Sequence, residues 1–133
     1  MQELRVVAWK QVPIGDGWED ESEQDAVVWI DLAKFDAAWR QSEDYVGQEG
    51  AGSQFEGRYQ RVGQFILAYG KLFIPTVCFD ESGAVGFTDG RHRVAWLRDH
   101  GVTTLPLSVP QRQAARFRRA FGTRRRRSVV LAP

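Results

Sequence analysis

The sequence is poor in cysteine, in long apolar runs and, towards its end, in acidic residues. A single Cys78 excludes an internal disulfide and a cysteine-based zinc site, and its apolar, strand-like surroundings predict that it is buried. The longest apolar runs, such as residues 65–68, are far too short to cross a bilayer, and residues 1–5 lack the apolar core of a secretion signal. We therefore expect a cytoplasmic protein with no membrane partner.

The composition is that of one ordinary folded domain. With 133 residues the chain is long enough for one core and too short for two good ones. Hydrophobic residues make up 43% and charged residues 26%, and five Trp with eight Phe supply large apolar side chains for a core. We expect a single domain over residues 1–122.

Charge is distributed very unevenly along the chain. Residues 1–110 hold 10 Lys or Arg and 17 Asp or Glu, whereas residues 111–133 hold eight Arg and no acid. Arg124, Arg125, Arg126 and Arg127 follow a Gly-Thr pair, which predicts a basic, flexible tail over residues 123–133. Such a tail suits nucleic-acid phosphates; the alternatives are a solvated tail and a strap over the acidic body.

Short apolar runs alternating with amphipathic stretches predict an α+β fold with a small mixed sheet and about four helices. Strands are expected at residues 4–9, 26–30, 72–79, 84–88 and 103–109. Helices are expected at residues 31–39 (capped by Asp31), 58–69, 89–100 and 111–121. Pro106 cannot donate to a strand ladder, so we expect an edge or bulge position for it.

The faces of these helices follow from apolar spacing. Inward-facing residues are expected to be Leu32, Phe35 and Trp39 in the first helix, Tyr59, Val62, Phe65, Ile66 and Tyr69 in the second, and Ala114, Phe117 and Phe121 in the last. The glycine-rich residues 45–57 are interpreted as a long flexible loop, and long loops inside compact domains are often functional. Six acids within residues 16–25 indicate an exposed loop, since their spacing fits no metal motif.

The most informative segment is the Asp-Gly-Arg-His-Arg sequence at residues 89–93, where a predicted strand turns directly into a helix. A helix N-terminus presents free backbone N–H groups with partial positive charge, and Gly90 leaves them open to a ligand. Arg91 and Arg93 add charges whose planar forks match phosphate oxygens. His92, between two Arg, is expected to be neutral and able to donate a hydrogen bond or act as a base. The alternative is that Asp89 caps the helix and pairs with an Arg while the other side chains face water.

This segment also resembles the core of the ParB/sulfiredoxin superfamily. The likeness covers residues 58–109 and includes Ile-Pro-Thr-Val at residues 74–77 and Leu-Pro-Leu at residues 105–107. In that superfamily a Gly-x-x-Arg turn binds nucleotide phosphates, and Gly90 and Arg93 match its two fixed positions. The Asp-Gly-x-His-Arg form is similar to that of the free-serine kinases. Arg91 stands where sulfiredoxin has its catalytic Cys, so sulfinic-acid repair is not expected.

The resemblance and the residues together lead to a nucleotide- or phosphate-binding domain as the first functional hypothesis, with ATP or CTP and magnesium as the implied ligands. The expected phosphate-binding residues are Gly90, Arg91, His92, Arg93, Arg58 and Arg61. If the protein is an enzyme, phosphoryl transfer or the hydrolysis of a nucleotide or phosphodiester is expected, with His92 and Asp89 as catalytic candidates. A carboxylate would be needed to orient a metal or nucleophile, and Glu49, Glu56 and Asp89 are the candidates. No resident metal site is expected.

Two other functions remain open at this point. The first is a nucleic-acid-binding or nuclease-like accessory protein of a plasmid or mobile element, which would use the same turn together with the Arg-rich tail. The second is a catalytically inactive interaction module whose basic surface binds an acidic protein. In the first hypothesis, the nucleotide- or phosphate-binding domain, the loop over residues 47–57 is a candidate lid.

Overall fold

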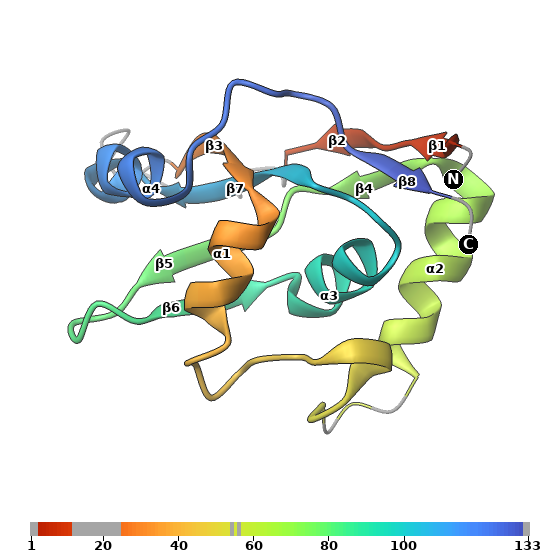
Figure 1. Ribbon diagram of the computed structural model, residues 1–133, viewed down its shortest axis with the longest axis horizontal. Coiled ribbons are helices and arrows are strands. Elements are labelled where there is room, and N and C mark those ends of the chain that lie inside the picture. Colours follow the sequence, from red (N-terminus) through yellow and green to blue (C-terminus); the bar gives the residue numbers. More distant parts are fainter. Residues whose placement is uncertain (1–2, 12–24, 54, 56, 132–133) are drawn as a thin grey trace, which may run out of the picture.

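A four-stranded mixed sheet with the order β3-β7-β5-β6 organises the molecule, which is described here from a computed structural model (Figure 1). The structure describes residues 3–11, 25–53, 55 and 57–131. Its elements are β1 (Glu3–Val6), β2 (Ala8–Lys10), β3 (Asp25–Asp31), α1 (Leu32–Trp39), the 3-10 helix η2 (Gln48–Gly50), α2 (Arg58–Tyr69), β4 (Lys71–Phe73), β5 (Thr76–Phe79), β6 (Val85–Asp89), α3 (Arg91–Asp99), β7 (Thr104–Pro110), the 3-10 helix η3 (Gln111–Gln113), α4 (Ala114–Phe121) and β8 (Val129–Leu131). The predicted α+β class is confirmed.

The sheet combines antiparallel and parallel pairs. β3 runs antiparallel to β7 over their whole length, from the pair Asp25–Pro110 to the pair Asp31–Thr104. β5 and β6 form a hairpin, and β5 runs parallel to β7. Two smaller sheets lie beside this one: β1 pairs antiparallel with β8, and β2 pairs parallel with β4.

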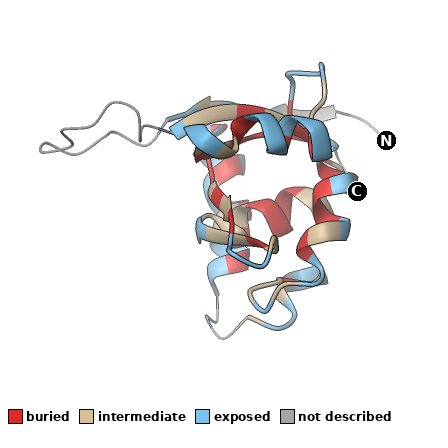
Figure 2. Cartoon of the chain, turned by 90° about the vertical axis from the view of Figure 1, so that its left-hand side faces the viewer, coloured by how far each residue is buried: buried red, intermediate tan, exposed pale blue. Residues whose placement is uncertain are grey.

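The core lies between the sheet and the helices, and Figure 2 shows the buried residues turned towards it. As predicted, Asp31 caps α1 by accepting a hydrogen bond from the backbone N–H of Lys34 (3.1 Å). Phe35 of α1 is buried and packs edge-on against Phe121 of α4, with ring centroids 5.4 Å apart. The inward faces predicted for α1 and α4 are therefore confirmed. Cys78 on β5 is half-buried rather than fully buried.

The segment 72–79, predicted as one strand, is two strands that belong to different sheets. β4 ends at Phe73 and pairs with β2, while β5 begins at Thr76 and pairs with β6 and β7. Pro75 between them has no N–H for a ladder, and its carbonyl accepts from the backbone N–H of Ser108 (2.8 Å). The chain therefore changes sheets at the proline. Residues 4–9 divide in the same way into β1 and β2, on either side of the buried Val7.

The edge position predicted for Pro106 is wrong, because β7 lies inside the sheet between β3 and β5. Alternate residues of a strand point their N–H groups to the same side. Since the N–H of Ser108 points towards β5, the nitrogen of Pro106 faces the same side, but at a level where β5 has not yet begun, because its first residue, Thr76, pairs with Ser108. The missing donor therefore costs the sheet no hydrogen bond.

Both outer edges of the four-stranded sheet are covered. On β6 the hydroxyl of Ser42 donates to the Val85 carbonyl, and Asp44 Oδ2 accepts from the backbone N–H of Phe87 at 2.8 Å. On β3 the chain after α4 lies alongside: Gly122 forms a β-bridge with Ile30. Neither edge is left as an open ladder at these positions.

The predicted flexible tail is instead a packed segment as far as residue 131. Residues 122–128, which we call the strap, lead from α4 to β8, and β8 pairs with β1 (Figure 1). Ser128 is buried, its hydroxyl donates to the Thr104 carbonyl (2.6 Å), and it accepts from the indole N–H of Trp9 (3.0 Å). Val130, 1% exposed, adds apolar burial that a free tail would lack.

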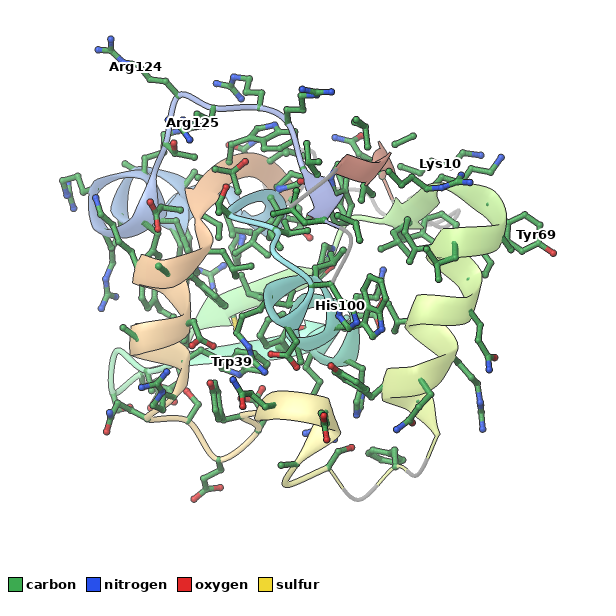
Figure 3. The ribbon with its side chains drawn as sticks, turned by 45° about the vertical axis from the view of Figure 1, so that its right-hand side comes forward. Lys10, Trp39, Tyr69, His100, Arg124 and Arg125 are labelled. Atoms are coloured by element: carbon green, nitrogen blue, oxygen red, sulfur yellow. The ribbon has the colours of Figure 1, made fainter. Side chains whose placement is uncertain are left out.

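The inward face predicted for α2 is partly wrong. Tyr59 and Ile66 are buried, but Phe65 and Tyr69 are exposed, and Figure 3 shows Tyr69 projecting outward from the helix. The reason is Gly63, which lies against the indole of Trp96: a Cβ at Gly63 would come within 2.5 Å of Trp96 Nε1. This close approach turns the face containing Gly63, rather than the Phe65–Tyr69 face, towards α3.

Candidate functional site

The turn at residues 89–93 has the strand-to-helix geometry that the sequence predicts, with the helix beginning two residues later. Asp89 ends β6, Gly90 adopts a left-handed conformation (φ 95°), and α3 begins at Arg91. A Cβ at Gly90 would lie 2.7 Å from Pro75 Cβ and 2.8 Å from Arg93 Nη2. Glycine is therefore required here both by the backbone conformation and by the space available.

The turn forms one wall of a hollow of about 620 Å³. Its cationic and polar lining comes from residues 88–93 and from Arg58 and Arg61 in the first turn of α2. Its aromatic lining consists of Phe55, Phe65, Phe73 and Phe87. The structure thus brings together all six of the predicted phosphate-binding residues, from two helices far apart in sequence.

Two of the arginines converge on one ring at the mouth of the hollow. The guanidinium carbon of Arg58 lies 4.3 Å from the ring centroid of Phe55, and that of Arg91 lies 5.4 Å from it. These are cation–π distances, so the ring holds two like charges close together. Within the described part of the chain, neither guanidinium has a carboxylate partner. Together with Arg61, they leave the hollow with unneutralised positive charge.

Arg93 differs from the other arginines because its guanidinium is already bound. Nη2 pairs with Asp89 Oδ2 at 2.8 Å, and Nη1 donates to the Phe73 carbonyl at 2.5 Å. Its side chain is only 15% exposed. Arg93 therefore ties the turn to β4. Asp89 does not cap α3 through its side chain but fixes the turn through this ion pair, which combines parts of both sequence interpretations.

His92 is buried at the inner side of the hollow. Its Nε2 lies 2.6 Å from Ser53 Oγ, and its ring stands edge-on to Phe55. Burial, together with the charges of Arg91 and Arg58, lowers the pKa of His92 below its ordinary value of 6.5. The imidazole is therefore neutral at pH 7, in agreement with the expectation from its neighbours.

Two of the described carboxylates, those of Asp44 and Asp89, line the hollow, and both contact protein groups. Asp44, which no sequence motif indicates, lines the hollow, but its oxygens accept from the Trp39 indole (2.9 Å) and from the Phe87 backbone. Asp89 is bound to Arg93. Of the other carboxylate candidates, Glu49 lies on η2 outside the hollow, and Glu56 lies outside the described residues.

The loop before α2, a candidate lid, is docked on α3 over much of its described length. Asp99 Oδ2 accepts from the backbone N–H of Glu49 (3.1 Å) and from the hydroxyl of Tyr59 (2.7 Å). Burial and this carboxylate raise the pKa of Tyr59 well above its ordinary value. The bond between Ser53 and His92 is a further attachment, so the loop reaches the motif directly.

A buried ion network behind the turn was not indicated by the sequence. Arg98 Nε pairs with Asp99 Oδ1 and Nη1 with Asp36 Oδ1, both at 2.9 Å, and Nη1 also donates to the Val46 carbonyl at 2.8 Å. These bonds join α1, the loop and α3. The sequence shows Arg98 and Asp99 side by side, which could have suggested an ion pair. Nothing in the sequence indicates that Asp36 of α1 joins them.

The basic residues Arg124–Arg127 lie elsewhere. They belong to the strap and line two other hollows, one with Arg118 and β3 and one with β8. The structure thus separates the two groups of predicted anion-binding residues. Across the residues that the structure covers, no cluster of three or more His, Cys, Asp or Glu side chains is placed to hold a metal ion. In the same residues, no helix is long and apolar enough to span a bilayer.

Comparisons with known proteins relate this chain to plasmid fertility inhibition factors. No curated protein sequence matches the chain. A solved crystal structure of an oncogenic suppression activity protein, a plasmid fertility inhibition factor in its gold(I) cyanide derivative, has a similar fold with a TM-score of 0.57. The match covers 84% of this chain at 19% identity, and this chain spans 63% of the length of that one. Residues 71–122, from β4 through the turn to the end of α4, match the family model of the plasmid fertility inhibition factor, and the chain is therefore similar to that family over this segment.

Proposed function

We propose that the hollow beside residues 89–93 binds the phosphate groups of a nucleotide. The observation that carries this proposal is the convergence of three unneutralised guanidinium groups, from Arg58, Arg61 and Arg91, beside a helix N-terminus opened by Gly90. Like charges held this close repel one another unless an anion lies between them. Phosphate meets the requirement because it accepts hydrogen bonds from backbone N–H groups and from planar guanidinium forks at once.

The aromatic side of the hollow favours a nucleotide over a bare phosphate. Phe65 and Phe73 are 46% and 48% exposed and stand on the same hollow as the arginines. Packing a planar base against such rings adds favourable binding free energy, which inorganic phosphate cannot obtain because it has no ring. The resemblance to the ParB/sulfiredoxin superfamily implies the same ligand class, with ATP or CTP and magnesium as the probes to use.

Binding, rather than catalysis, is the function proposed. Of the described carboxylates on the hollow, Asp44 accepts hydrogen bonds from the Trp39 indole and the Phe87 N–H, and Asp89 pairs with Arg93 through Oδ2. His92 is neutral and contributes a hydrogen-bonding group at the inner side of the hollow. The biological setting proposed is that of a plasmid accessory protein, on the strength of the likeness to plasmid fertility inhibition factors.

A second candidate is a nucleic-acid strand in the same hollow, as in a nuclease-like accessory protein. It is favoured by Tyr69, whose ring lies 4.8 Å from that of Phe65 and continues the aromatic surface beyond the hollow. A row of exposed rings beside arginines is the arrangement on which successive bases stack. Mononucleotides and short single strands therefore compete for the same residues, and their relative affinity distinguishes the two functions.

The test is calorimetric titration of the full chain with ATP, CTP, GTP and pyrophosphate in the presence of magnesium. We expect nucleotide binding that is weakened at least about tenfold in Arg91→Ala, since a charge-assisted hydrogen bond contributes roughly 1.5–3 kcal/mol. Arg119→Ala, which removes an exposed arginine outside the hollow, is the matched control and should bind normally. Binding that is equal in both variants, or absent for every ligand, contradicts the proposal. Single strands that bind much more tightly than mononucleotides favour the second candidate.

A further inference from the structure

A second basic surface lies away from the hollow, where α4 meets the strap. Its guanidinium groups come from Arg118, Arg124, Arg125 and Arg126, which we call the arginine face. Arg118, Arg124 and Arg126 line one shared hollow with β3, and Arg125 and Arg126 line the next. Figure 3 shows Arg124 pointing outward from the strap. None of these residues lines the hollow at the turn, so the two basic surfaces are separate.

The strap holds this surface in place. At its start, Thr123 donates its backbone N–H to the Trp29 carbonyl at 3.1 Å, and at its end Thr104 Oγ1 donates to the Arg127 carbonyl at 2.8 Å. The buried Ser128 and strand β8 follow at once. The arginines therefore project from a backbone that is anchored on both sides, and a ligand need not order a free tail in order to bind them.

The charge on the arginine face is not neutralised by the described part of the protein. All four arginines are exposed, and no described carboxylate pairs with any of them. Residues 111–133 contain no acid at all. Four like charges on adjoining, anchored segments repel one another, and a bound polyanion would relieve this repulsion.

The kind of polyanion follows from what surrounds these charges. The exposed large apolar side chains of the described residues are elsewhere: Val6, Phe55, Phe65, Leu67, Tyr69 and Phe73. Trp29, which borders the face, is half-buried. An interface with an acidic protein usually has apolar or aromatic residues at its centre, and a single-stranded nucleic acid needs rings for its bases. A duplex needs neither, because its outer surface is a regular array of phosphates.

We infer that the arginine face binds the phosphate backbone of double-stranded nucleic acid, without reading its sequence. This binding is independent of the nucleotide proposed for the hollow at residues 89–93. Arginine suits the role because one guanidinium fork bonds two phosphate oxygens, and the shared position of Arg126 between the two hollows makes the contact surface continuous.

The test measures the affinity of the full chain for a fluorescent DNA duplex of about two helical turns, by anisotropy, between about 50 and 200 mM salt. Each phosphate contact contributes about 0.9 to the slope of log affinity against log salt. The double variant Arg124→Ala/Arg126→Ala should therefore flatten the slope by about 2 and weaken binding roughly tenfold or more at low salt. Arg124→Lys/Arg126→Lys, which keeps both charges, should retain most of the slope.

The matched control is Lys10→Ala/Lys71→Ala, which removes the same charge from two exposed positions on β2 and β4. It should leave the slope unchanged. Equal losses in the two double-alanine variants would overturn the inference, because binding would then depend on total charge alone. Tighter binding of a single strand, equal competition by polyglutamate, or no binding of duplex would overturn it as well.

Discussion

Replacing Gly90 by alanine tests the geometry on which the turn depends. The left-handed conformation at this position costs an L-residue with a Cβ about 1–2 kcal/mol. The new methyl group would also lie 2.7 Å from Pro75 Cβ and 3.0 Å from Pro75 Cα, and this buried proline between β4 and β5 cannot easily move aside. Overpacking of this kind costs about 1–3 kcal/mol, so the variant should lose roughly 2–5 kcal/mol of unfolding free energy. In a chain of this size that lowers Tm by roughly 7–18 °C.

Gly83→Ala provides the matched control. Gly83 has a similar backbone conformation (φ 88°), but its added Cβ would meet the end of the long Arg116 side chain at 3.0 Å. That side chain can move, so only the backbone cost of about 1–2 kcal/mol should appear. The assay is urea unfolding of both variants with the slope m compared to the parent. Equal destabilisation by the two substitutions would refute the role assigned to the contact with Pro75.

Three further outcomes are expected. Arg98→Met leaves the carboxylates of Asp36 and Asp99 without their buried partner and should cost about 3–5 kcal/mol of unfolding free energy; a loss below about 1 kcal/mol would show that the network contributes little. Because the pKa of His92 is lower in the folded than in the unfolded chain, the unfolded chain binds more protons near pH 6, so Tm should fall as the pH drops below about 6.5. His92→Gln should remove this component of the pH dependence, and an unchanged pH profile would contradict it. Ser128→Ala removes the hydroxyl that bonds the buried Thr104 carbonyl and the half-buried Trp9 indole N–H, and it should lower the unfolding free energy by about 1–3 kcal/mol; a Tm equal to the parent's would mean that the strap is not anchored there.

The parts of the structure that the sequence predicted are those fixed by local chemistry. Asp31 marks the start of α1 because a capping side chain acts within its own helical turn. The hairpin of β5 and β6 and the glycine turn into α3 follow from residues that are neighbours in the chain. The sequence predicted that Arg58 and Arg61 share a phosphate site with the arginines of the turn, and the structure places all of them on one hollow.

The parts that could not be predicted depend on contacts between distant segments. Phe65 was expected inside because its spacing fits an apolar stripe, but the face that α2 buries is set by Gly63 against Trp96, which lies on another helix. Asp44 lines the hollow only because the loop after α1 runs along β6. Arg93 fits the Gly-x-x-Arg spacing, but its bond to the Phe73 carbonyl depends on where the chain passes from β4 to β5.

The covered edges of the four-stranded sheet limit how this protein can associate with others. Side chains of Ser42 and Asp44 occupy hydrogen-bonding groups along β6, and the chain at Gly122 lies beside β3. An extended peptide from another molecule would therefore find the donors and acceptors at these positions already taken, which disfavours recognition by strand addition at both edges of the sheet.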